Sequence, residues 1–313
     1  MVYCSKCGQK NDSANQTCKE CGSLLIKKEY FQKKNLNDFE DILTNENSLE
    51  LEELNIKIYS QVIENIKDMG KSRLNTNYCS TPLEKIRNIA GVYAKINYKS
   101  RGAELGSYAF NSIQIDDRLD ESSQISTLIH ELAHHLSSEI FEQLLMYVWG
   151  CEKSDALEAV VWLISMKERL NLLSDEYCAH TCEGRFIPHG YQNYGSFNII
   201  LTPIFKKQYD EKTIKAGIVF GNTIAQDIIE ILEEFIDDKL RNEIRIQFKK
   251  DYRYPPTYDE ILLESKEVLS SNEKIGYIIG MLKKGIVLAR EENMTEILNE
   301  FKKGYEEVNE TSH

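Results

Sequence analysis

A run of apolar residues encloses three histidines and one glutamate in the segment ISTLIHELAHHL, residues 125–136. The apolar members are Ile125, Leu128, Ile129, Leu132, Ala133 and Leu136. This period is typical of a helix with a buried face, so we expect the polar residues in the interior rather than on a loop. Because His130 and His134 are four residues apart, they lie one turn above each other on the same side of the helix.

Two imidazoles placed one helical turn apart can bind the same zinc ion, at Zn–N distances of about 2.0–2.1 Å. Glu131 lies beside them, where its carboxylate can accept a proton from an activated water without being a ligand itself. His135 points about 100° away from His134, so we expect it to pack or to face solvent. The H-E-x-x-H spacing therefore predicts a catalytic zinc site with Glu131 as the general base.

The third protein ligand of a catalytic zinc ion must come from elsewhere in the chain. Residues 172–186, LLSDEYCAHTCEGRF, hold the remaining candidates on a second expected helix. Glu176 and His180 share a face of this helix, and Glu176 would complete a His-His-Glu site. Asp175 and His180 remain alternative third ligands.

The first 28 residues are polar and hold two C-x-x-C pairs, each followed by a glycine. Cys4, Cys7, Cys18 and Cys21 have the spacing C-x2-C-x10-C-x2-C. Four thiolates make a closed tetrahedral zinc site, which is structural in character. The segment resembles the short zinc-ribbon modules found at the ends of many bacterial proteins. We expect the other paired thiols, Cys178 and Cys182, to be buried packing residues.

The composition is that of a globular protein, with 42% hydrophobic and 28% charged residues in a chain of 313. The formal net charge of −12 disfavours nucleic acid as a partner of the main body. The N-terminal residues do not have the pattern of a signal peptide, and the longest apolar candidate is interrupted by Lys283 and Lys284. We therefore expect a cytoplasmic protein with no membrane span. Gly276 and Gly280 are spaced for close helix contact, which we expect to reflect packing.

The predicted fold class is α+β and predominantly helical, with a zincin-like catalytic core, a small sheet, an N-terminal zinc ribbon and a helical C-terminal region. The predicted divisions are the ribbon (1–28), a helical linker (29–80), the metallopeptidase core (81–204) and the C-terminal region (205–313). Strands are predicted at 92–98 and 107–116. One or two helices are predicted between about 36 and 69, and single helices at 81–90, 122–149, 154–173, 175–184 (from Ser174 to Gly184), 211–240, 258–270, 272–289 and 293–306.

TLIHELAHHL, the preceding strand that ends in IQID, and the later SDEYCAH together resemble the gluzincin metallopeptidases. The closest likeness is to compact intracellular zincins, including those that cleave bacterial and phage repressors, and it covers about residues 85–186. The resemblance implies His130 and His134 as ligands, Glu131 as general base and acid, and Glu176 as third ligand. The chain departs from the family in an apparent extra helix before Glu176 and in His180, where relatives often have aspartate.

The predicted function is a zinc-dependent endopeptidase that cleaves a cytoplasmic protein, with a partner recruited by the ribbon. Candidates for stabilising the oxyanion are His180, His189, Tyr191 and Tyr194. The strand SYAFNSIQID could pair with an extended substrate backbone if it lies at a sheet edge. A non-catalytic adaptor that binds a protein or nucleic acid, with a structural ion at the histidines, is the alternative, and the motif also fits a hydrolase of non-peptide amides.

Overall fold

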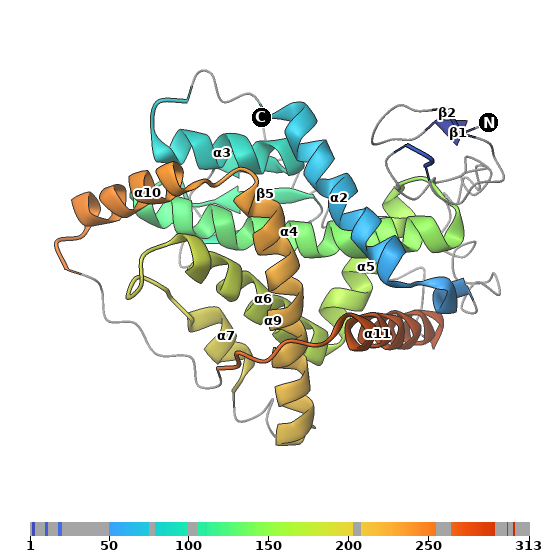
Figure 1. The fold of residues 1–313 in the computed structure, drawn as a ribbon. Coiled ribbons are helices and arrows are strands. Elements are labelled where there is room, and N and C mark those ends of the chain that lie inside the picture. The colour runs from blue at the N-terminus through green and yellow to red at the C-terminus, as the bar shows by residue number, and fades with distance from the viewer. Residues whose placement is uncertain are drawn as a thin grey trace.

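The structure is a computed structural model that describes residues 2–3, 10–11, 18–20, 50–74, 79–98, 105–109, 111–202, 208–254, 264–291, 299 and 303. Within these ranges the chain is mostly helical, with a small three-stranded sheet against the central helix (Figure 1). This confirms the predicted helical α+β class. Among the described helices, none combines the length and the apolar character needed to cross a bilayer.

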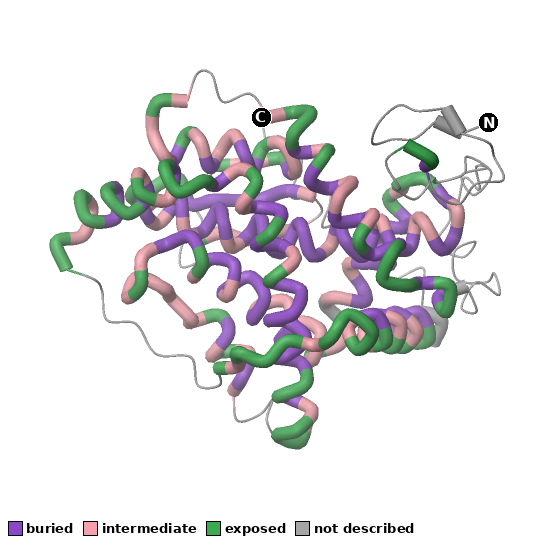
Figure 2. The backbone as a smooth tube through the Cα atoms, viewed as in Figure 1, coloured by how far each residue is buried: buried purple, intermediate pink, exposed green. Residues whose placement is uncertain are grey.

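The central helix, α4 (Glu121–Trp149), carries the H-E-x-x-H motif and matches its predicted range within one residue. It begins at Asp120, whose side chain accepts from the Ser123 N–H, and ends at Gly150, which adopts the left-handed conformation that favours glycine. Figure 2 shows α4 buried along most of its length. Other elements therefore surround it, as expected for a helix that is apolar on most sides.

The sheet has the order β3-β5-β4, with β3 (Lys95–Tyr98) parallel to β5 (Ser112–Ile115) and β4 (Gly106–Ala109) antiparallel to β5. The prediction of one strand over 107–116 is wrong, because this segment folds as a hairpin. Asn111 turns the chain at φ 58°, in the left-handed region that asparagine tolerates. As a result β5 is central and buried, and β4 forms an edge of the described sheet.

The region before the sheet contains η1 (Glu50–Glu53), α2 (Ile56–Arg73) and α3 (Pro82–Tyr93). The predicted capping box is present, since Thr81 accepts from the Glu84 N–H and the Glu84 side chain accepts in return. Because α3 continues to Tyr93, the predicted strand start at 92 is wrong and β3 begins at Lys95. Helical structure is predicted over 36–69, and the part of this range up to position 49 lies outside the described residues.

The next helices are α5 (Asp155–Lys167), α6 (Arg169–Phe186) and the short α7 (Gly195–Ile200). The predicted break at Ser174 is wrong, because the chain leaves helical geometry at Glu168 instead. The Glu168 carboxylate accepts a hydrogen bond from the Tyr209 hydroxyl and forms an ion pair with Lys284. These contacts hold Glu168 in place at the break between α5 and α6. Ser174 donates to the Leu170 carbonyl inside α6.

The C-terminal region contains α9 (Glu211–Glu233), α10 (Asp238–Asp251) and α11 (Ser271–Glu291). The predicted single helix over 211–240 is wrong, because Asp237 caps a new helix. The predicted helix over 258–270 is also wrong in its described part. Residues 264–270 are irregular and bond to α6 and α9 side chains, and the predicted helix at 293–306 lies almost wholly outside the described residues.

One hydrophobic cluster extends from Leu51 to Ile286 and joins the N-terminal, central and C-terminal helices. A smaller cluster lies between α6, α7 and α9. At the N-terminus, β1 (Val2–Tyr3) pairs antiparallel with β2 (Lys10–Asn11), and Cys18 is buried. Cys4, Cys7 and Cys21 lie outside the described residues, so the predicted zinc site of four cysteines stays a prediction.

Candidate metal centre

Helices α4 and α6 bring His130, His134 and Glu176 together. The Nε2 atoms of the two histidines are 3.2 Å apart, and each is 3.7 Å from an oxygen of Glu176. Ligand atoms of a tetrahedral zinc ion with bonds of about 2.0–2.1 Å are separated by about 3.3 Å, which is close to these distances. Glu176 Oε2 is buried and has no hydrogen-bond partner among the described residues. The three side chains therefore form a largely buried group that could hold a metal ion.

The other nitrogen of each histidine faces a different carboxylate of α6. His134 Nδ1 lies 2.7 Å from Asp175 Oδ2, and His130 Nδ1 lies 3.3 Å from Glu183 Oε2. If each Nδ1 donates its proton to a carboxylate, each Nε2 lone pair is free to bind a metal. Of the three candidate third ligands, this arrangement favours Glu176, because Asp175 contacts the far nitrogen of His134.

The carboxylates make the site strongly attractive to positive charge. Burial lowers the pKa of His134, but Asp175 and Glu176 outweigh it and raise this pKa to about 9. Burial is likewise outweighed at His130, where Glu176 and Glu183 raise the pKa well above its usual value. Burial raises the pKa of Glu176, but the histidines outweigh it and hold this pKa well below its usual range. The same field favours either protons or a metal cation at the imidazoles.

The histidine pair opens into a cavity of about 560 Å³ between α4, α6, α7, α10 and β4. Glu131 lines this cavity, and its Oε1 lies near Gly106 at the start of β4. Aromatic side chains from the 188–194 segment and α10 form another part of the lining: Tyr191, Phe248 and Tyr252. No lysine or arginine is among the described lining residues.

His180 lies beside His130, with ring centroids 4.5 Å apart. Its Nδ1 is 3.2 Å from Glu183 Oε2 and its Nε2 is 2.8 Å from Ser196 Oγ, so both ring nitrogens have partners. The predicted oxyanion role of His180 stays a prediction, and these contacts favour a positioning role. Burial, followed by the charge of His130, lowers the pKa of His180.

Of the other oxyanion candidates, Tyr191 lines the cavity, whereas His189 is exposed and Tyr194 packs edge-on against His180 without lining the cavity. His135 is buried, and its Nδ1 lies 3.3 Å from the Tyr108 hydroxyl. This confirms packing as its role, one of the two expected.

Cys178 and Cys182 are both buried, as predicted, and Cys182 donates to the Ala225 carbonyl of α9.

Sequence reasoning missed Glu183, the third acidic residue that contacts the histidine pair, after Asp175 and Glu176. A signal was present, because Glu183 is seven residues after Glu176 and two helical turns return to the same face. The predicted helix over 175–184 already contained Glu183, but only Asp175, Glu176 and His180 were considered as ligands. Ser126, which donates to Glu183 from α4, was missed with it.

Comparison of the chain with protein-family models, with curated proteins and with solved structures finds no match.

Proposed function

We propose that the chain is a zinc-dependent endopeptidase that acts on a cytoplasmic protein. The observation that carries the proposal is the group of His130, His134 and Glu176, in which one buried carboxylate oxygen has no hydrogen-bond partner. Two imidazoles and one carboxylate are the ligand set of many catalytic zinc sites, and they leave a fourth position open. The donor set and the spacing of its atoms fit zinc.

Zinc at such a site supplies a Lewis acid that activates water and polarises a carbonyl group. Glu131 follows His130 directly on α4 and lines the same cavity, so its carboxylate can accept a proton from the attacking water. The same carboxyl group then returns the proton to the leaving amine. During these transfers Asp175 holds the ring of His134, and Glu183 holds the ring of His130, each through the Nδ1 atom of the histidine.

The edge strand β4 supports a peptide as the substrate. Gly106, Ser107 and Tyr108 of β4 line the cavity, and the opposite edge of the strand pairs with β5. Its other edge, which pairs with no strand of the described residues, can add an extended substrate backbone without requiring a particular sequence. Since the described lining has no lysine or arginine to bind a terminal carboxylate, an endopeptidase is favoured over a carboxypeptidase.

Zinc content and turnover together test the proposal. His134→Ala and Glu176→Gln each remove one ligand, so we expect each variant to lose about one equivalent of zinc per chain by elemental analysis. Glu131→Gln removes the general base and no ligand, so it is expected to keep its zinc and lose turnover by at least about 10²-fold.

Substrates can be found by comparing protein termini in cells that express the native chain or Glu131→Gln. New termini are expected with the native chain only. If Glu131→Gln behaves like the native chain in cells while His134→Ala loses its ion, the ion is structural and the adaptor alternative is correct.

A further inference from the structure

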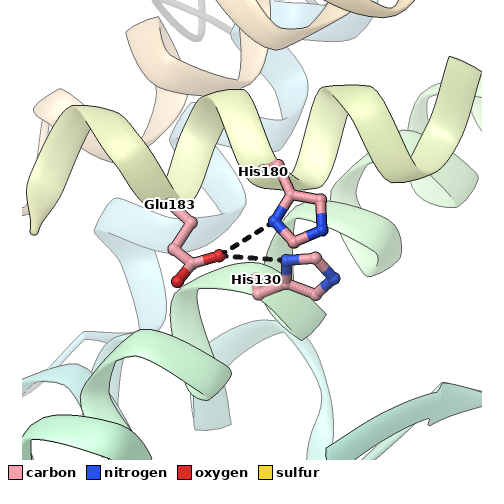
Figure 3. A group of neighbouring side chains, drawn as sticks. All are labelled: His130, His180 and Glu183. Carbon is pink, nitrogen blue, oxygen red and sulfur yellow. Dashed lines mark hydrogen bonds and ion pairs between the residues drawn. The ribbon is translucent and has the colours of Figure 1, made fainter. Parts of the chain in front are cut away.

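Glu183 lies between two histidines from different helices (Figure 3). Its Oε2 faces Nδ1 of His130 on α4 at 3.3 Å and Nδ1 of His180 on α6 at 3.2 Å. Its Oε1 accepts a hydrogen bond from Ser126 of α4. The Glu183 residue is only 5% exposed, so water contributes little to satisfying this carboxylate. It has three donors in a buried position, which fixes its orientation.

The same three side chains, His130, His180 and Glu183, are also close enough to hold a metal ion of their own. Hydrogen bonds account for this group without an ion, because 3.2 and 3.3 Å are close to the range for N–H donors to a carboxylate. An ion there would also have to share His130 with the site at Glu176. Unlike Glu176 Oε2, the Glu183 oxygens already have partners.

We infer that Glu183 is the positioning residue for His130, doing for the first histidine what Asp175 does for the second; this rests on the zinc site proposed above. A proton held on Nδ1 by Glu183 leaves the Nε2 lone pair directed toward Glu176. His180 supports Glu183 in turn when it carries its proton on Nδ1, because Nδ1 then donates to Glu183 and Nε2 accepts from Ser196. The network therefore connects the first ligand on α4 to α7, which lines the cavity.

The inference is tested by zinc affinity, measured by competition with a chromophoric chelator. Removing the carboxylate partner of a zinc-bound histidine typically weakens metal binding 10–100-fold, so we expect about this loss at the histidine site in Glu183→Ala. Glu183→Gln keeps one acceptor oxygen and is expected to lose less affinity. Glu142→Gln is the matched control, because Glu142 is also buried but contacts Lys153 rather than the site. Its zinc affinity is expected to equal that of the native chain.

A spectroscopic measurement separates positioning from a general loss of structure. With ¹⁵N-labelled histidine, the zinc-loaded native chain is expected to show a slowly exchanging His130 Nδ1 proton, which is lost in Glu183→Ala. Replacing zinc with Co²⁺ distinguishes this site from the cysteine site, because only thiolate ligands give strong charge-transfer absorption.

The inference is overturned if Glu183→Ala binds zinc within about threefold of the native chain, or if Glu142→Gln loses as much. An additional zinc equivalent that depends on Glu183 and His180, but survives in His134→Ala, would assign a second metal site instead. If His134→Ala keeps all its zinc, the proposed function itself fails. If His134→Ala loses zinc and Glu183→Ala keeps native affinity, only the positioning role fails.

Discussion

Gly106, at the start of β4, decides how closely this strand approaches the motif helix α4. The four-residue spacing that predicts His130, Glu131 and His134, and the carboxylate that predicts Glu176, give no signal for this glycine. A Cβ added there would lie 2.4 Å from Thr127 Cγ2, 2.9 Å from the Gln114 carbonyl and 3.3 Å from Glu131 Oε1. Only a residue without a side chain lets β4 approach α4 this closely.

Gly106→Ala is therefore expected to displace β4 from α4 and to shift the general base. We expect a loss of about 1–3 kcal/mol in the free energy of unfolding, typical of overpacking, with a decrease in peptide turnover. Zinc content is expected to stay at the native level, because none of the three atoms nearest to the added Cβ belongs to a proposed ligand. Urea unfolding, elemental analysis and a peptidase assay check these three outcomes. Gly276→Ala is the control, since its added Cβ meets no atom within 4 Å.

Whole elements were predictable where their ends carry local signals. The range of α4 was predicted within one residue because Asp120 and Gly150 mark both ends, and α3 was located from its capping box. The wrongly predicted element boundaries lie where contacts with residues distant in sequence determine the structure. The break at Glu168 depends on Tyr209 and Lys284, which are remote in sequence. The hairpin turn at Asn111 was missed although a local signal was present, because the polar pair Asn111-Ser112 interrupts the apolar pattern and asparagine is common in turns.

A charge cluster joins the buried Glu139 and Glu142 of α4 to the partly buried Glu158 of α5 and to the exposed Lys153 between these helices. Lys153 is the shared partner of Glu142 at 2.6 Å, Glu139 at 3.0 Å and Glu158 at 3.7 Å. One lysine cannot neutralise three carboxylates. Burial raises the pKa of Glu142 to about 8, against the lowering effect of Lys153.

Glu142 should therefore make stability depend on pH. Its folded-state pKa exceeds the ordinary value of 4.5, so its contribution is full below that value and is lost as pH rises through about 8. We expect Glu142→Gln to become more stable relative to the native chain between pH 5.5 and 8, by up to about 1.4 kcal/mol per pH unit. Urea unfolding at several pH values measures this difference. Glu139, whose pKa is lowered, is the control: Glu139→Gln should show no such gain, and a gain equal to that of Glu142→Gln would contradict the assignment.

At the scale of the whole molecule, the C-terminal region belongs to the architecture of the site. Helix α9 packs against α6 through Gly217 and Gly221, and a Cβ at Gly221 would lie 2.3 Å from the Ser174 carbonyl oxygen. Ser174 directly precedes Asp175 and Glu176. The sequence pattern indicated another pair, Gly276 and Gly280, but added Cβ atoms there meet no atom of the described residues within 4 Å. The spacing is the same in both pairs, so only the packed structure distinguishes them.

Gly221→Ala tests whether α9 holds the metal centre in place. The added methyl group meets backbone atoms of α6, which cannot rotate aside, so α9 must move away from α6. We expect a loss of at least about 1–3 kcal/mol in the free energy of unfolding and weaker zinc binding, because Glu176 shifts with its helix. Gly280→Ala on α11 is the matched control and is expected to be neutral or to stabilise by up to about 1 kcal/mol. A Gly221→Ala protein that is destabilised yet binds zinc with native affinity would show that α9 supports the fold without positioning Glu176.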